Sequence, residues 1–164
     1  MGGNYAPAIK PHAYAEKEGY SQVLWLFGED ETVAEVGSMN IFFFLINKET
    51  GNKELLTAPL TRGDILPGVT RESVLDMARS WGEFDVVERF ATMPEIRDAV
   101  HEGRMLEAFG TGTSPIVCPV SCINYKGEDL DIPVTGDVTQ RVWNEIIGIQ
   151  YGTMEGPEGW SYKI

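Results

Sequence analysis

The sequence has little cysteine, and its two cysteines do not form a recognisable metal or redox motif. Cys118 and Cys122 are the only cysteines among 164 residues. On one extended strand their Cα atoms would lie roughly 13 Å apart, whereas a disulfide requires about 7 Å or less. Their spacing fits neither a zinc knuckle nor a thioredoxin-like CxxC motif. We therefore expect two free thiols, partly or fully buried, and a reducing compartment.

Basic residues and long apolar runs are also scarce. Thirteen Lys and Arg face twenty-five Asp and Glu, which gives a net charge of −12. This balance argues against nucleic acid and an anionic membrane surface as partners. The longest apolar run, residues 41–46, is far too short to span a bilayer. The first residues do not read as a secretory signal, and we expect any targeting segment to lie upstream of them.

The patterns that are present predict one mixed α/β (α+β) domain. Apolar residues make up 43% of the chain and charged residues 23%, as in ordinary globular proteins. Glycines at 110 and 112 form a loop between two short extended segments. Strands and helices do not alternate regularly, which argues against repeated βαβ units. The expected strands are 23–27, 32–36, 41–46, 55–60 and 84–90, and the expected helices are 13–18, 70–81, 93–101 and 138–149, with Thr70 as an N-cap.

Glu35 is the most unusual residue of the predicted strands. It lies inside the apolar run 33–36, and no Lys or Arg occurs between Glu29 and Asn47. A carboxylate that is buried without a partner is costly, so a buried Glu35 would need a cation or a donor from elsewhere in the chain. Alternatively, the strand lies at a sheet edge and Glu35 faces water.

Two glycine-containing segments are candidates for a ligand site. In LPGVTR (residues 66–71), a glycine precedes a predicted helix, whose free N–H groups and positive dipole end suit an anion. In GTGTS (residues 110–114), the glycines allow close backbone approach to a ligand. Both patterns also occur in ordinary turns, so neither segment is decisive by itself.

Five segments together resemble the C-terminal half of the branched-chain amino-acid aminotransferases, which are class IV pyridoxal-phosphate-dependent enzymes. The resemblance runs from Met1 to about Trp160. It implies the fold of the larger C-terminal domain of the fold-type IV (D-amino-acid aminotransferase-like) enzymes, here as one incomplete domain over residues 1–164. The segments are MGGNY (1–5), TVAEVGSMN (32–40), LPGVTR (66–71), FGTGT (109–113) and IQYG (149–152).

The resemblance assigns roles to individual residues. Glu35 would bond the pyridine nitrogen of pyridoxal 5'-phosphate and keep it protonated, and Tyr5 would bond its phenolic oxygen. The cofactor phosphate would be held by the amides of Val69 and Thr70 and by Thr113. The substrate would be bound by three residues, namely Ser38 (where the family usually has threonine), Met39 and Ser114.

The resemblance also implies what these residues do not include. In the family, the Schiff-base lysine stands immediately before the residue that matches Met1, and none of the six lysines here holds that position. The family's N-terminal domain also has no counterpart in these residues. Cys118 matches the second cysteine of a redox CxxC found in some members, but Pro115 holds the first position.

The leading expectation is a branched-chain aminotransferase that exchanges the amino group of leucine, isoleucine or valine with 2-oxoglutarate. The complete protein would be a homodimer in the cytoplasm or the mitochondrion, and the 164 residues alone would be inactive. One alternative is a non-catalytic truncated homologue that acts as a binding or dimerisation partner. Another is a different fold-type IV enzyme, a D-amino-acid aminotransferase or an aminodeoxychorismate lyase, although residues 35–40 and 149–152 favour the branched-chain group.

Overall fold

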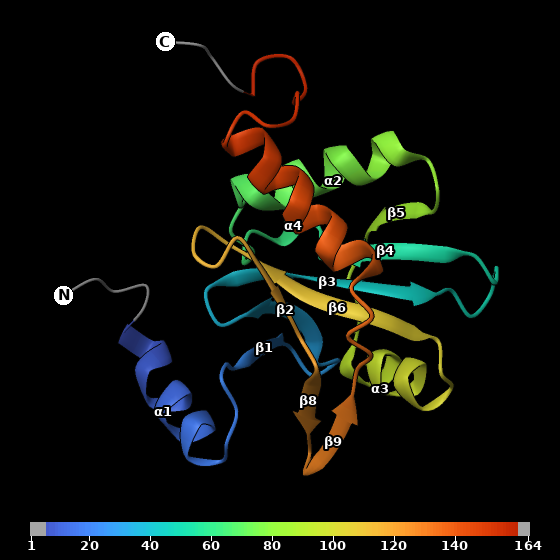
Figure 1. Cartoon of the computed structure of the whole chain (residues 1–164). Helices are drawn as coiled ribbons and strands as arrows, with labels where there is room; N and C mark the ends of the chain where they lie inside the picture. The colour runs from blue at the N-terminus through green and yellow to red at the C-terminus, as the bar shows by residue number, and fades with distance from the viewer. Residues whose placement is uncertain (1–5, 161–164) are drawn as a thin grey trace.

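The computed structural model describes residues 6–160 as a twisted sheet with elements packed on both faces (Figure 1). Helices α2 and α4 cover one face, while α3 and the β8–β9 ribbon cover the other. The elements in chain order are a 3₁₀ turn at Ala6–Ala8, α1 (Ile9–Lys17), β1 (Leu24–Phe27), β2 (Thr32–Val36), β3 (Met39–Ile46), β4 (Lys53–Thr57), a 3₁₀ turn at Leu60–Arg62, α2 (Val69–Trp81), β5 (Asp85–Glu88), α3 (Met93–His101), β6 (Met105–Thr111), β7 (Val117–Pro119), β8 (Cys122–Tyr125), β9 (Glu128–Asp131) and α4 (Asp137–Gln150).

Strand β3 is the centre of the sheet. Strand β6 pairs along one edge of β3, while β2 and then β4 pair along the other edge. These pairings are antiparallel, and the parallel pair β4–β5 is joined by the crossover helix α2. Because both faces of β3 are covered, its side chains are buried from Met39 to Leu45, which explains the continuous apolar run in the sequence.

Alternation along β3 creates two separate cores. Ile41 and Phe43 pack with α3 and the β8–β9 ribbon, whereas Phe42 and Phe44 pack with α2 and α4. The rings of Phe42 and Phe109 stack across the β3–β6 pair with centroids 5.2 Å apart. The layer of α2 and α4 and the layer of α3 and the β8–β9 ribbon thus lie on opposite faces of β3. The position of a residue along β3 therefore decides which layer its side chain faces.

The strands and helices that were expected are confirmed, with shifted ends. Strand β4 ends at Thr57, and not at residue 60, because Pro59 leads into the 3₁₀ turn. Helix α1 begins at Ile9 and includes Pro11 in its first turn, where a proline costs no intrahelical hydrogen bond. The expectation that Thr70 caps α2 is wrong, because the N-cap is Gly68 and Thr70 lies in the first turn.

The β8–β9 ribbon was not expected from the sequence. It separates the two cysteines, since Cys118 lies in β7 and Cys122 begins β8. The assumption that both occupy one strand is therefore wrong, although both are free thiols and partly buried, as expected. Among the described residues, no helix is long and apolar enough to cross a membrane.

Candidate active site

Three polar side chains form a row across the sheet. Glu35 of β2 pairs with Asn40 of β3, and Asn40 pairs with Thr111 of β6. Directly opposed residues of antiparallel strands project from the same face, so these three side chains lie side by side. The face is the one that carries α2, because Asn40 contacts the segment leading into that helix.

A bulge in β2 aims Glu35 at this face. In the β1–β2 pair, Trp25 opposes Glu35 and Leu26 opposes Val33, so Ala34 is an extra residue that has no partner on β1. Val33 and Val36 can then both enter the core on the α3 side, although they are three residues apart. β-Bulges redirect side chains in this way beside functional sites.

Glu35 is half-buried and is held by neutral donors. Its Oε1 accepts a hydrogen bond from the backbone N–H of Leu66 at 3.0 Å and a longer one from Asn40 Nδ2 at 3.4 Å. Burial raises the pKa of Glu35, the Leu66 N–H opposes that rise, and the charge of Asp64 adds to it. The edge-strand alternative is wrong, because β2 lies between β1 and β3. The partner that a buried Glu35 requires is supplied by the segment that precedes α2.

The N-terminus of α2 faces the glycine loop, so the two glycine-containing motifs lie close together. The Thr70 hydroxyl donates a hydrogen bond to the carbonyl of Gly112 at 3.1 Å. Gly68 offers no side chain to cap the helix, so the first-turn N–H groups have no intrahelical acceptor. Val69 is 84% exposed. The positive end of α2 is therefore open to an anion.

The glycines of both motifs lie close to side chains of β3, Gly68 to Asn40 and the two loop glycines to Met39. A Cβ on Gly68 would lie 2.3 Å from Asn40 Oδ1, which is closer than any ordinary contact. A Cβ on Gly110 or Gly112 would meet the Met39 side chain at about 3.1 Å. A side chain at either loop glycine would therefore fit only if Met39 shifted by a few tenths of an ångström.

The remaining predicted residues that the structure describes lie around the same end of the sheet, but the side chain of Met39 is on the opposite face. Ser38 is exposed in the β2–β3 turn, and Thr113 and Ser114 are exposed in the loop after Gly112. Met39 is buried and points to the opposite face from Asn40. Tyr5 lies outside the described residues.

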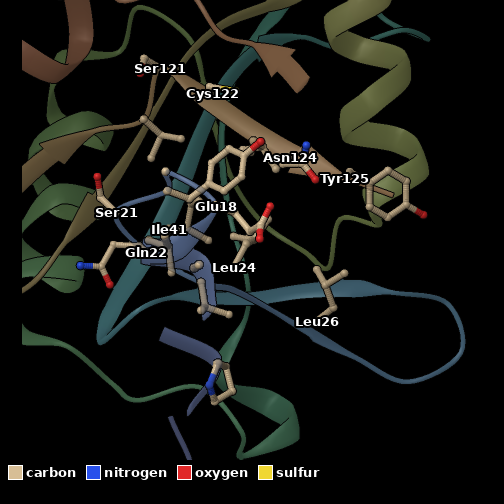
Figure 2. Close-up of a pocket in the computed structure, with 18 of the residues that line it drawn as sticks. Glu18, Ser21, Gln22, Leu24, Leu26, Ile41, Ser121, Cys122, Asn124 and Tyr125 are labelled. Atoms are coloured by element: carbon tan, nitrogen blue, oxygen red, sulfur yellow. The ribbon is translucent and has the colours of Figure 1, made fainter. Parts of the chain in front are cut away.

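A cavity of about 1100 Å³ lies on the opposite face of the sheet (Figure 2). Its walls come from α1, from β1 with Leu24, from β3 with Ile41, and from β8 with Asn124 and Tyr125. Of the predicted site residues that the structure describes, Met39 alone borders it. The cavity is thus separate from the row that contains Glu35.

Two residues of the row were not predicted. Asn40 is the one polar residue in a strand of apolar side chains, and this contrast was a signal that could have found it. Thr111 is buried, and its hydroxyl makes no hydrogen bond within the described part of the chain. Its place in the row could not be found from the sequence, because threonine is common in strands.

Comparison with known families agrees with this arrangement. The sequence model described as "Amino-transferase class IV" matches residues 2–123. The chain belongs to the class IV aminotransferases. Its match includes β2, β3, the start of α2 and the glycine loop, so every described candidate residue lies within it.

Curated members of this family are closely similar to the chain. A "Branched-chain-amino-acid aminotransferase" of Monosiga brevicollis is 52% identical over 94% of this chain and 40% of the relative. The protein of the same name from Dictyostelium discoideum is 49% identical over 100% of this chain and 43% of the relative. The mouse cytosolic form is 47% identical. The chain spans about 40% of the length of these class IV aminotransferases.

Solved structures confirm the expected mixed α/β fold. A branched-chain amino acid aminotransferase from Escherichia coli superposes with a TM-score of 0.73 at 25% identity, covering 97% of this chain and 48% of that one. The enzyme from Thermoproteus uzoniensis gives a TM-score of 0.70 at 28% identity over 92% of this chain and 44% of its own. The fold is that of fold-type IV aminotransferases.

Proposed function

We propose that these residues form the cofactor-binding part of a branched-chain amino-acid aminotransferase. The complete protein would exchange the amino group of leucine, isoleucine or valine with 2-oxoglutarate. The observation that carries the proposal is the convergence of Glu35, the open N-terminus of α2 and the glycine loop in a chain about 50% identical to curated enzymes of that name.

Pyridoxal 5'-phosphate fits the groups that are available. Oε1 of Glu35 is engaged, while Oε2 accepts no hydrogen bond from the described residues and can take one from a ring N–H. The free amides of Val69 and Thr70 and the exposed Thr113 hydroxyl suit the phosphate. The bound cofactor supplies a protonated ring that withdraws electrons from the substrate α-carbon.

Residues of this chain would bind and orient the substrate. Ser38 and the backbone near Ser114 are exposed at the same end of the sheet, where they can donate hydrogen bonds to a carboxylate. Met39 packs against Gly110 and Gly112, so we propose that it supports this loop in addition to bordering the substrate. Tyr5 would reach the phenolic oxygen of the cofactor.

The remaining expectations also enter as proposals. Curated relatives include cytosolic and mitochondrial enzymes, so we propose one of these two compartments and a homodimer for the complete protein. None of the six lysines of this chain matches the cofactor-anchoring lysine of the family. We therefore expect the 164 residues alone to be inactive.

The test is an assay of the longest natural reading frame that contains these residues, with the 164-residue chain as a comparison. Amino transfer to 2-oxoglutarate is measured from leucine, isoleucine, valine and D-alanine. The proposal expects turnover with the three branched-chain substrates and none from the shorter chain. Turnover with D-alanine in place of leucine would indicate another fold-type IV enzyme. Cofactor binding without any turnover would favour the non-catalytic homologue.

A further inference from the structure

Asn40 is a buried amide at the meeting point of the two halves of the proposed cofactor site. It is 5% exposed and lies between Glu35 and Thr111 in the row across the sheet. Its neighbours along β3, Met39 and Ile41, are apolar and face the opposite core. A buried amide in this setting is costly unless its donors and acceptors are used.

The amide group of Asn40 is bonded to both sides of the site. Nδ2 donates to the carbonyl of Leu66 at 2.9 Å and, at the longer distance of 3.4 Å, to Oε1 of Glu35. Leu66 in turn donates its N–H to the same Oε1, and its carbonyl also accepts from the N–H of Gly68. Asn40, Glu35 and Leu66 therefore close a ring of hydrogen bonds.

Leu66, which belongs to this ring of hydrogen bonds, lies two residues before the N-cap of α2. Gly68 is the N-cap of the helix, and Val69 and Thr70 are its first residues. The ring also directs both donors to Oε1 of Glu35, which leaves Oε2 for a ligand. The Asn40 side chain and the Leu66 N–H together connect the carboxylate to the anion-binding helix end.

We propose that Asn40 is a positioning residue that fixes Glu35 relative to the N-terminus of α2, so that the pyridine ring and the phosphate of one cofactor molecule are bound together. The identity of the cofactor rests on the proposed function, but the coupling between the two groups does not. Asn40 touches neither the substrate nor the reacting atoms in this account.

The contact with Gly68 provides a specific test of the coupling. Gly68 has φ −69° and ψ 133°, a conformation that any residue adopts, so alanine there causes no backbone strain. Its added Cβ would instead meet Asn40 Oδ1 at 2.3 Å, and the next neighbour, Arg71 Cβ, is 3.6 Å away. Gly68→Ala should therefore displace the Asn40 amide and imitate its loss.

The experiment is a double-mutant cycle in the longest natural reading frame, with Asn40→Ala, Gly68→Ala and both together. The probes are pyridoxal 5'-phosphate and inorganic phosphate, whose dissociation constants are measured by calorimetry, and thermal unfolding is followed without ligand. Each single variant should weaken pyridoxal 5'-phosphate about tenfold or more, as expected for lost hydrogen bonds to a charged group and its partner. Gly68→Ala should have little further effect once Asn40 is alanine.

A spectroscopic readout separates positioning from general stability. Glu35 would accept a hydrogen bond from the protonated ring nitrogen of the cofactor, so misplacing Glu35 would lower the pH at which that proton is lost. The titration of the ring nitrogen, followed by NMR of cofactor labelled with nitrogen-15 at that position, should therefore shift to lower pH in Asn40→Ala. Asn144→Ala, at an exposed position of α4, is the matched control and should change neither affinity nor titration.

The outcomes distinguish the two claims. If the parent protein binds pyridoxal 5'-phosphate and the variants bind it equally well, the positioning role is wrong and the proposed function stands. If the parent does not bind it, the proposed function fails. Thermal unfolding of the three variants then tests the coupling by itself. If Gly68→Ala destabilises the protein less when Asn40 is already alanine, the coupling is supported. If the destabilisations of the two single variants add up to that of the double variant, the coupling is wrong.

Discussion

At the scale of single residues, Glu35 is the one acidic side chain among the described residues of the proposed cofactor site. Its carboxylate is half-buried, has two neutral donors on one oxygen, and stands near Asp64. Arg62 forms an ion pair with Asp64 and is not a partner of Glu35. No basic side chain within the described range contacts Glu35, so it is poised to hold a protonated ligand group.

Glu35→Gln removes this charge while keeping the shape and the acceptor for Leu66. In the complete enzyme, turnover should fall by about 100-fold or more, as when a preorganised charge is removed from an active site. The dissociation constant of pyridoxal 5'-phosphate should change much less, because the phosphate contacts remain. Steady-state kinetics and calorimetry measure the two effects, and equal turnover in both proteins would make Glu35 merely structural.

The same variant should alter stability in a pH-dependent way. Burial raises the folded-state pKa of Glu35 above its unfolded value, so the folded state binds the proton more tightly. Stability from this group is present at acid pH and is lost as the pH rises through the folded pKa. Glu35→Gln should therefore unfold at higher urea than the parent at neutral pH, and the difference should shrink in acid.

At the scale of elements, the start of α4 is capped by a residue from a distant strand. Glu107 of β6 is 2% exposed and accepts hydrogen bonds from the N–H groups of Val138 and Thr139 at 3.1 and 2.9 Å. The hydroxyls of Thr135 and Thr139 also donate to it. Burial alone would raise the pKa of Glu107, but these donors hold it below its usual value. The helix is thereby fixed to the central β3–β6 pair.

Glu107→Ala should destabilise the protein by about 2–4 kcal/mol, because it leaves buried donors without an acceptor. Urea unfolding measures the change, with Glu49→Ala in an exposed turn as the control. Since the folded pKa is lowered, the contribution is present above the unfolded pKa and is lost as the pH falls through the folded pKa. A difference below about 0.5 kcal/mol at neutral pH would contradict the capping role.

Some elements could be predicted from the sequence because local patterns decide them. Strand β3 follows from its apolar run, and α3 from its spacing, from Thr92 as N-cap and from Pro94 in the first turn. The β8–β9 ribbon could not be predicted, since β9 is rich in acidic residues and its turn contains Lys126 at φ 53°. Contacts from outside hold it, including the Tyr20–Asp129 and Tyr125–Glu31 hydrogen bonds. Such long-range contacts leave no mark in a local pattern.

The site shows the same division. Glu35, the segment before α2 and the glycine loop were each marked by motifs, and their proximity is seen in the Leu66 and Thr70 hydrogen bonds. The bulge at Ala34 and the role of Asn40 were missed because both depend on strand register. Register is fixed by which face each strand buries, and this is a property of the assembled sheet.

At the scale of the whole molecule, the sheet separates the Glu35 row from the cavity beside α1. The Glu35 row lies on the α2 face, while the cavity between α1, β1 and β8 lies on the other face (Figure 2). Glu35 and the start of α2 do not line this cavity, and Met39 is the one described candidate residue that borders it. We therefore place the proposed cofactor site at the Glu35 carboxylate and the free amides of α2, and not in this cavity.

The most direct test of this account is a crystal structure of the complete protein with pyridoxal 5'-phosphate. We predict that Oε2 of Glu35 contacts the ring nitrogen and that the phosphate lies against the amides of Val69 and Thr70. Electron density for the cofactor in the cavity beside Ile41 and Tyr125, with Glu35 free of it, would contradict the central claim.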